Sequence, residues 1–390
     1  MSTLDIQYTC DVAIIGGGPV GAALALALRG SNYDVRVLEA RRVDHAANDS
    51  RALVLSYGSR LLLARLGLWD KLTPISPIRT IHISQKNYFG RTLLRAQEAR
   101  VPELGYVVPY GVLQATLHSA LQASDIASLD GAEVMQLHGT AQGATISYQQ
   151  GATQHLLQAR LAVIADGGKL LEASYPPKVH DYGQSAIIGH VTCSQPKADA
   201  AFERFTVQGP LALLPYQGGY ELVWTVANGR VQEMLQWNDA YFLDQLQRQF
   251  GDRVGEFLTV GKRACFPLRL KRALDIPLPH SVQLGNAAQT LHPVAGQGFN
   301  LGLRDAFELA QKILVCNPDS LGDNAMLSAY HKQRRLDRNG GIHFTDSLVR
   351  LFSNDLPILS SGRALGLSVL DCLPGAKMFV ARRMIFGANG

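Results

Sequence analysis

The sequence has few cysteines, few charged residues and no long apolar run, and each shortage excludes a class of protein. Its five cysteines are odd in number, widely spaced and without a C-x-x-C pair, so we expect neither a disulfide framework nor a structural metal site. The longest uncharged stretches, such as 12–28 and 276–303, are broken by Gly, Pro, Gln, Asn or His. Neither resembles the ~20 apolar residues that cross a bilayer.

What remains is the composition of a globular protein. Hydrophobic residues make up 47% of the 390 residues and charged residues 18%, which excludes a disordered or collagen-like chain. The length allows two or three domains or one large α/β unit. Residues 1–18 have no basic region ahead of their apolar stretch, so they do not resemble a secretory signal. We therefore expect a cytoplasmic protein.

The positive charge is concentrated at the end of the chain. Residues 331–390 contain nine Lys or Arg and four Asp, a net +5 that equals the charge of the whole protein. No nucleic-acid motif accompanies this segment, so we expect no nucleic acid partner. Apolar stretches alternate there with Arg363, Lys377, Arg382 and Arg383, which suits peripheral contact with the inner membrane surface. Helices that pack over the fold with their charges toward water would explain the pattern equally well.

The first forty residues have the pattern of a strand, helix and strand. Residues 8–15 and 34–40 are apolar or β-branched, and 19–30 is rich in Ala and Leu. The intervening turn reads G-x-G-x-x-G, and an acidic residue ends the second strand; these are Gly16, Gly18, Gly21 and Glu39. The glycines permit a tight turn, close approach of a pyrophosphate and close helix packing, and the carboxylate can accept from ribose hydroxyls. The pattern predicts a dinucleotide site, the alternative being a glycine-rich structural turn.

A second glycine loop occurs late in the chain. Residues 281–305 read as a short strand, a polar turn, a glycine loop and a helix beginning near Gly298. Such a loop brings backbone N–H groups and a helix amino end to one point, which suits negative charge.

Three motifs together resemble the flavin-dependent aromatic hydroxylases of the p-hydroxybenzoate hydroxylase fold. They are the GGGPVG turn, the ADG tripeptide at 165–167 and GNAAQTLHPVAGQGFNLGLRD at 285–305, in matching order and spacing. AFERFTVQGPLALLP at 201–215 is similar to the ubiquinone-biosynthesis branch, nearest to the 2-polyprenyl-6-methoxyphenol hydroxylases. The resemblance implies an α/β protein with a Rossmann-like FAD-binding domain, an interleaved β-sheet substrate domain and a helical C-terminal segment.

The resemblance also implies a set of FAD contacts. Gly16, Gly18, Gly21 and Glu39 would hold the ADP half, and Asp166 and Asn286 would approach the pyrophosphate and ribityl groups. The isoalloxazine would be lined by Pro293, Gly296, Gln297, Gly298 and Asn300, with Arg51 and Gln114 as further flavin contacts. The sequence departs from the family at D-G-x-x-S, which here reads Asp166-Gly167-Gly168-Lys169-Leu170. In the family that motif serves both the flavin and the nicotinamide donor. We therefore expect the departure to affect reduction of the flavin rather than FAD binding.

The domains are expected to interleave along the chain. We assign 1–180 and 262–350 to the FAD-binding domain, 70–110 and 181–261 to the substrate domain, and 351–390 to a C-terminal helical segment. The strand-like middle of the chain offers four aromatic residues either as the floor of an apolar pocket or as core: Phe202, Phe205, Tyr216 and Trp224.

The activity that the resemblance implies is monooxygenation. A polyprenylated phenol would be hydroxylated by molecular oxygen through a flavin 4a-hydroperoxide, with FAD as cofactor and NADH or NADPH as co-substrate. His292 is a candidate acid or base, although a structural histidine fits as well, and no catalytic residue is assigned. The alternatives are an FAD-dependent oxidase or reductase on the same fold, and a structural FAD-binding subunit of a ubiquinone-biosynthesis assembly.

Overall fold

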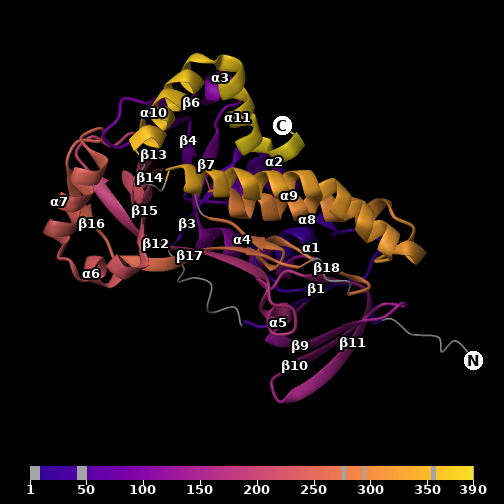
Figure 1. Ribbon diagram of the computed structural model, residues 1–390. Coiled ribbons are helices and arrows are strands. Elements are labelled where there is room, and N and C mark those ends of the chain that lie inside the picture. The colour runs from indigo at the N-terminus through magenta and orange to yellow at the C-terminus, as the bar shows by residue number, and fades with distance from the viewer. Residues whose placement is uncertain (1–8, 42–50, 275–277, 293–295, 353–356, 390) are drawn as a thin grey trace, which may run out of the picture.

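The computed structural model describes residues 9–41, 51–274, 278–292, 296–352 and 357–389. Figure 1 shows two large sheets side by side, with the last helices of the chain at the top of the molecule. The polypeptide passes between the two sheets several times, because strands early and late in the sequence belong to the same layer.

The first layer is a seven-stranded sheet. It consists of β1 (Cys10–Ile15), β2 (Val35–Glu39), β8 (Ala127–Asp130), β9 (Ala132–Gly139), β10 (Ala144–Gln150), β11 (Thr153–Ile164) and β18 (Ser281–Gln283). The order is β8-β2-β1-β11-β10-β9, with β18 paired to β11. Strand β1 runs parallel to β2 and β11, whereas β9, β10 and β11 are antiparallel. The apolar run of β1 is almost entirely buried, as expected of a central parallel strand covered on both faces.

Helices cover the parallel part of this sheet. They are α1 (Pro19–Ala27), α4 (Tyr110–Gln122), α8 (Gln297–Val315) and α9 (Asn324–Phe352). Helix α1 packs against α8, and α8 against α9, which lie side by side in Figure 1. Val12, Ile14, Leu24 and Leu309 belong to one buried cluster that joins strand and helices. The predicted strand–helix–strand unit and the helix starting near Gly298 are confirmed.

A buried ionic cluster fastens α8 to α9. Arg334 is 2% exposed, and its Nε and Nη2 lie 2.6 Å from Asp305 Oδ1 and 2.7 Å from Asp337 Oδ2. Arg304 Nε donates to the same Asp337 Oδ2 at 2.8 Å. Burial alone would raise the pKa of Asp337, but the charges of Arg304 and Arg334 hold it below its ordinary value. Arg334, one of the basic residues of the C-terminal segment, is therefore paired inside the fold and does not add to the surface charge.

The second layer is a nine-stranded sheet in the order β19-β17-β12-β15-β14-β13-β5-β6, with β16 paired to β12. Its strands are β5 (Thr80–Gln85), β6 (Arg91–Arg95), β12 (Lys178–Cys193), β13 (Ala200–Thr206), β14 (Gly209–Tyr216), β15 (Gly219–Ala227), β16 (Phe257–Val260), β17 (Ala264–Arg272) and β19 (Gln289–Thr290). Helices α6 (Val231–Gln236) and α7 (Asp239–Phe250) cover one face, where Phe202, Trp224 and Phe242 share a buried core. This interleaved sheet confirms the predicted fold class; the domain boundaries stay a prediction.

A small sheet and several helices complete the fold. Strands β3 (Ala52–Ser56), β7 (Gly105–Pro109) and β4 (Ser76–Ile78) pair in that order. The remaining α-helices are α2 (Tyr57–Arg65), α3 (Ala96–Ala99), α5 (Lys169–Glu172), α10 (Pro357–Cys372) and α11 (Pro374–Phe386). Helices α3, α10 and α11 lie at the top of Figure 1. In the described ranges no single helix has the length and hydropathy to cross a bilayer; Gly362–Cys372 and Pro374–Phe386 pass that test only as a pair bent by 96°.

Two C-terminal cations do not point toward a lipid surface. Lys377 is 7% exposed, with its Nζ 2.9 Å from Glu98 Oε2 and 3.5 Å from Asp371 Oδ1. Arg363 is also buried and donates through Nη1 to the Leu351 carbonyl at 2.5 Å. The expectation that these two side chains lie free along a membrane face is wrong, because both join the last helices to the rest of the fold.

Candidate functional site

Two positions of the first glycine turn are packed too closely for any other residue. Gly16 follows β1 with φ +105°, and a Cβ there would lie 2.7 Å from the carbonyl oxygen of Ala165. A Cβ on Gly21 would overlap the carbonyl oxygen of Gly16. These two glycines thus let α1 and the end of β11 approach the turn, as the spacing predicts.

Two helix amino ends are left open in front of this turn. Gly18 caps α1 and Gly296 caps α8. Among the described residues neither helix has a side-chain cap, and a Cβ on Gly18 or Gly298 would meet no atom within 4 Å. The unpaired N–H groups of a first helical turn attract negative charge. Both ends therefore offer space and donors to an anionic ligand.

The same packing brings the two amino ends together. A Cβ on Gly302 of α8 would lie 2.9 Å from Val20 Cγ2 of α1, and one on Gly285 3.1 Å from the same atom. Gly285 opens the turn Gly285–Ala287, in which Asn286 is exposed. Asn286 thus lies beside both helices, in reach of a ligand that spans them.

Glu39 is held against the glycine turn. Its Oε2 accepts from the Gly17 N–H at 2.7 Å, and Oε1 accepts from the backbone N–H and Nε of Arg41 at 2.9 and 3.0 Å. A carboxylate has about four acceptor positions, so the orienting bonds leave room for a ribose hydroxyl. Gly17 was not singled out in the sequence, although its place between Gly16 and Gly18 was a sufficient signal.

Gln114 points into the same region from α4. It is buried, and its Nε2 donates to the Gly17 carbonyl at 3.3 Å. Its Oε1 is buried without a hydrogen bond from any described group. Because buried acceptors are normally satisfied, this oxygen fits a ligand hydroxyl such as those of a ribityl chain. Arg51 directly precedes β3, and its guanidinium lies 5.0 Å from the ring centre of Tyr110 and 5.2 Å from that of Phe266.

Asp166 is engaged by its own turn. Its carboxylate accepts from the N–H groups of Gly168 at 2.8 Å and Leu170 at 2.6 Å, directly before α5. Gly167 and Gly168 have φ +83° and +95°, so the altered family motif folds into a tight turn that the aspartate closes. A contact between Asp166 and the pyrophosphate stays a prediction.

Asn300 is an anchor of the second loop. It is fully buried; Oδ1 accepts from Ser56 N–H at 2.8 Å and Ser59 Oγ at 2.6 Å, and Nδ2 donates to the carbonyls of Val54 and Gly296 at 2.8 and 2.7 Å. These four bonds use the full capacity of the amide. The Asn300 side chain therefore positions the amino end of α8 against β3. The predicted contact between Asn300 and the flavin would have to come from its backbone.

The other predicted loop residues differ in their surroundings. Gln297 is buried and donates through Nε2 to the Met384 carbonyl of α11 at 3.3 Å. Pro293 lies outside the described residues. His292 is buried edge-on against Tyr182, with ring centres 5.2 Å apart, and burial lowers its pKa to about 4. It is therefore neutral near pH 7, as a packed histidine would be.

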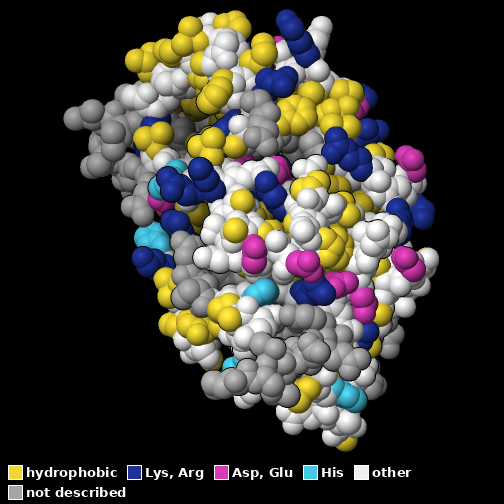
Figure 2. Space-filling view, turned by 90° about the vertical axis from the view of Figure 1, so that its right-hand side faces the viewer, with side chains coloured by type: hydrophobic (Ala, Val, Ile, Leu, Met, Phe, Trp, Pro, Cys, Tyr) yellow, Lys and Arg dark blue, Asp and Glu magenta, His cyan; other side chains and the backbone are white. Residues whose placement is uncertain are grey.

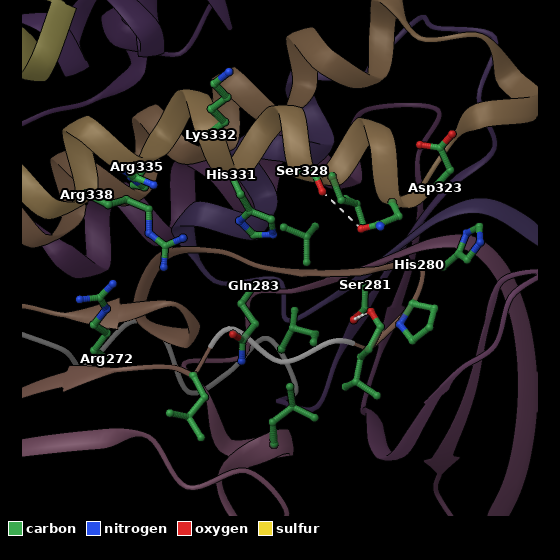
Figure 3. Close-up of a pocket in the computed structure, with 18 of the residues that line it drawn as sticks. Arg272, His280, Ser281, Gln283, Asp323, Ser328, His331, Lys332, Arg335 and Arg338 are labelled. Atoms are coloured by element: carbon green, nitrogen blue, oxygen red, sulfur yellow. Dashed lines mark hydrogen bonds between the residues drawn. The ribbon is translucent and has the colours of Figure 1, made fainter.

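A large open pocket of about 850 Å³ lies elsewhere, between β18 and the first half of α9. Figure 3 shows Arg338 and His331 reaching from α9 toward Gln283, with Arg272 on the opposite side. Described residues that line it include four cations: Arg272, Lys332, Arg335 and Arg338. The sequence signal for this pocket was the 332, 335, 338 spacing on one helix face. None of the predicted flavin contacts that the structure describes lines it.

Residues 9–339 match the FAD binding domain family. The chain belongs to that family. The open helix ends, the unsatisfied Gln114 oxygen and the orienting bonds on Glu39 fit the FAD that this family binds, and NADH or NADPH is its typical co-substrate.

Two relatives with assigned names are similar to this chain over nearly its whole length. It is 32% identical over 389 residues to ubiquinone hydroxylase UbiL of Rhodospirillum rubrum, covering 96% of this chain and 89% of the relative. It is 31% identical over 376 residues to 3-demethoxyubiquinol 3-hydroxylase of Escherichia coli, covering 93% and 94%.

Solved structures show the same fold at lower identity. The p-nitrophenol 4-monooxygenase PnpA of Pseudomonas putida superposes with a TM-score of 0.79 at 15% identity, covering 98% of this chain and all of that one. An HpxO variant of Klebsiella pneumoniae complexed with FAD has a TM-score of 0.75 at 16% identity, with coverage of 98% and 100%.

Proposed function

We propose that this chain is an FAD-dependent monooxygenase that hydroxylates a polyprenylated phenol in ubiquinone biosynthesis, using molecular oxygen and NADH or NADPH. The observation that carries the proposal is the meeting of the glycine turn, the Asn286 turn and the open end of α8 at one place. Similarity over nearly the whole chain to two relatives named as hydroxylases of ubiquinone or its precursors supports the substrate class.

The residues have separable tasks in this reaction. FAD, once reduced, supplies the oxygen chemistry. Glu39 and the glycine turn would hold its adenosine end, Gln114 and Asn286 its middle, and the first-turn amides of α8 would stabilise negative charge on the ring. Asn300 fixes those amides through Gly296.

The decisive experiment separates hydroxylation from simple oxidation. Purified protein with FAD, NADPH or NADH and 2-geranylphenol should give one hydroxylated product for each donor consumed. An oxidase or reductase would consume donor and release peroxide without that product. A structural FAD subunit would leave the bound flavin oxidised with either donor, even when the phenol is present. In cells lacking the protein, mass spectrometry should find an accumulated prenylated precursor.

Contact with a membrane surface is the second part of the proposal. The exposed apolar side chains of α10, α11 and the residue that joins them include Leu365 at 66%, Phe379 at 65%, Val369 and Leu373. Phe89, in the hairpin between β5 and β6, is fully exposed, and its neighbour Gly90 packs on Ala364 of α10. Figure 2 shows hydrophobic side chains gathered at the top, where Figure 1 places these helices. A polyprenyl tail resides in lipid, so this end would face it.

A narrow apolar pocket supports the same orientation. It has a volume of about 40 Å³ and lies between Val54, Gln297 and Asn300 on one side and Ala381, Met384 and Ile385 of α11 on the other. Helix α11 thus separates the loop predicted to hold the flavin from the exposed apolar end of the molecule. A prenyl tail entering beneath α11 would arrive beside that loop.

Liposome sedimentation tests the membrane contact. Leu365→Gln with Phe379→Gln should weaken binding of the FAD-loaded protein to phosphatidylglycerol vesicles at least tenfold. The matched control is Leu156→Gln with Leu258→Gln, which removes equally exposed leucines from β11 and β16. Equal binding by both double variants would reject α10 and α11 as the lipid-facing end.

A further inference from the structure

The two faces of the nine-stranded sheet are packed very differently. On one face Phe202, Leu211 and Trp224 are buried against α7. On the other, a row of paired residues runs across five strands: Ile83, Glu203, Ala212, Val223 and Ile188. All five are only half-buried. The second face is therefore mostly apolar and only partly covered by the rest of the protein, and we call it the open face.

This open face is directed toward the candidate flavin site. Side chains alternate along a strand, so Ala201, Glu203 and Phe205 of β13 share it. Ala201 packs in one cluster with Val54 and Tyr216, and Val54 also accepts from Asn300 of the second glycine loop. Glu203 therefore lies on the side of the sheet that meets the loop assigned to the flavin ring.

Phe205, which follows Glu203 on the same face of β13, also lies near that loop. Phe205 packs in a cluster with Tyr182 and Val349, and Tyr182 contacts His292, directly before that loop. Glu203 lies between Ala201 and Phe205, so both flanks of its position border the candidate site. Of the four aromatic residues considered from the sequence, Phe202 and Trp224 face α7, Phe205 is buried in a cluster, and Tyr216 remains on the open face.

Glu203 is the unusual group on this surface. Glu221, the other carboxylate on the open side of the central strands, is bonded to His190 Nδ1 at 3.0 Å. Glu203 has no hydrogen bond or ion pair with any described residue. Its surroundings raise its pKa from 4.5 to about 7 by desolvation alone. A carboxyl group without a protein partner, on an apolar surface, fits a ligand that brings its own hydroxyl.

We propose that the open sheet face is the floor of the phenol site and that Glu203 accepts the substrate's phenolic proton. This inference rests on the proposed function and names the group that activates the ring. The phenolic O–H bond breaks, the proton moves to Glu203, and the electron pair stays on the phenolic oxygen, where it enriches the ring. When the hydroxylated ring loses its ring proton to water, the phenolic oxygen takes the first proton back from Glu203.

The geometry suits a phenol rather than a polar substrate. Ile83 and Ala212 lie opposite Glu203 on the two neighbouring strands. Val223 and Ile188 extend this apolar surface across the next two strands, as an aromatic ring with a prenyl tail requires. Tyr216 lies on the same face and can flank the ring. A base whose pKa is near the working pH is effective because it is ionised yet retains affinity for the proton.

The test is Glu203→Gln in the FAD-loaded protein. Glutamine keeps the shape but cannot take the proton. With 2-geranylphenol, we expect hydroxylated product per NADPH to fall at least tenfold, with peroxide released instead and FAD affinity unchanged. In the wild type kcat/KM for the phenol should rise as pH passes about 7 and then level, and the variant should lose this rise. Glu133→Gln, an exposed carboxylate of β9, is the matched control.

Glu203→Asp distinguishes loss of the proton acceptor from a folding defect in Glu203→Gln. Aspartate retains a proton acceptor, so coupling and the rise with pH should be partly restored relative to glutamine. Intact coupling and an unchanged pH profile in Glu203→Gln would overturn the role of Glu203 while leaving the proposed function in place. A wild-type protein that oxidises NADPH without hydroxylating the phenol would instead reject the proposed function itself.

Discussion

Replacing Asn300 with alanine should destabilise the protein rather than simply remove a flavin contact. The side chain bridges β3 and α2 to the amino end of α8 through four hydrogen bonds between 2.6 and 2.8 Å. Alanine would leave the N–H of Ser56 and the hydroxyl of Ser59 without this acceptor, in a region closed to water.

The size of the effect follows from those two donors. A buried donor deprived of its partner costs roughly 1–3 kcal/mol, so Asn300→Ala should cost about 3 kcal/mol. An unfolding entropy of roughly 2.1 cal/mol/K per residue makes each kcal/mol worth about 1.2 °C for a chain of this length. The expected fall in the melting temperature is therefore about 4 °C.

The assay compares two asparagines that the sequence assigned to the same cofactor. Asn286 is exposed in the turn beside α1. Asn286→Ala should leave the melting temperature of the apoprotein within about 1 °C of the wild type but weaken FAD binding several-fold in a fluorescence titration. Asn300→Ala should lower the melting temperature of the apoprotein before any FAD is added. An apoprotein equally stable with alanine at position 300 would refute the anchoring role.

Four further outcomes are expected. Gly21→Ala should weaken FAD binding more than tenfold by titration, because its Cβ would overlap the Gly16 carbonyl, whereas Gly366→Ala in α10 meets no atom and should not. Glu39→Lys should weaken FAD binding similarly, since it removes the acceptor for Gly17 and for ribose. Arg334→Met should lower stability in a thermal melt by about 3–5 kcal/mol, because Asp305 is left buried without its cation. Glu203→Gln should gain stability relative to the wild type as pH rises from about 4.5 to about 7, by about 3 kcal/mol, because only the wild-type carboxyl must ionise there; a pH-independent difference in melting temperature would refute this.

The nucleotide-binding half of the fold was predictable because its constraints are local. Gly21 is required by the carbonyl of Gly16 in the same turn, and Gly16 by its own φ of +105°, so their spacing carries the information by itself. The role of Asn300 was not predictable in this way. Its partner Ser56 is 244 residues away in the sequence, and the same Gly-Gln-Gly-Phe-Asn string would read identically whether the amide faced a flavin or β3.

Counting charges along the chain likewise could not show which basic residues are exposed. The excess of Lys and Arg after residue 331 is real, but Arg334 is neutralised by aspartates of α8 and α9, and Lys377 lies between Glu98 and Asp371. Glu98 is 279 positions from Lys377 in the sequence, so no local pattern pairs them. Net charge of a segment describes its surface only after its buried pairs have been removed.

Glu203 shows where sequence and structure have to be combined. In AFERFTV both alternating sets of positions contain apolar residues, so the strand period alone cannot tell which face is core. The clusters decide it, since Phe202 packs on α7 while Ala201 and Phe205 pack on the opposite side. A charged residue on a fully packed face would need an ion pair to remain buried. Glu203 has none and lies on the open face, so the missing partner is better sought in a ligand than in the protein.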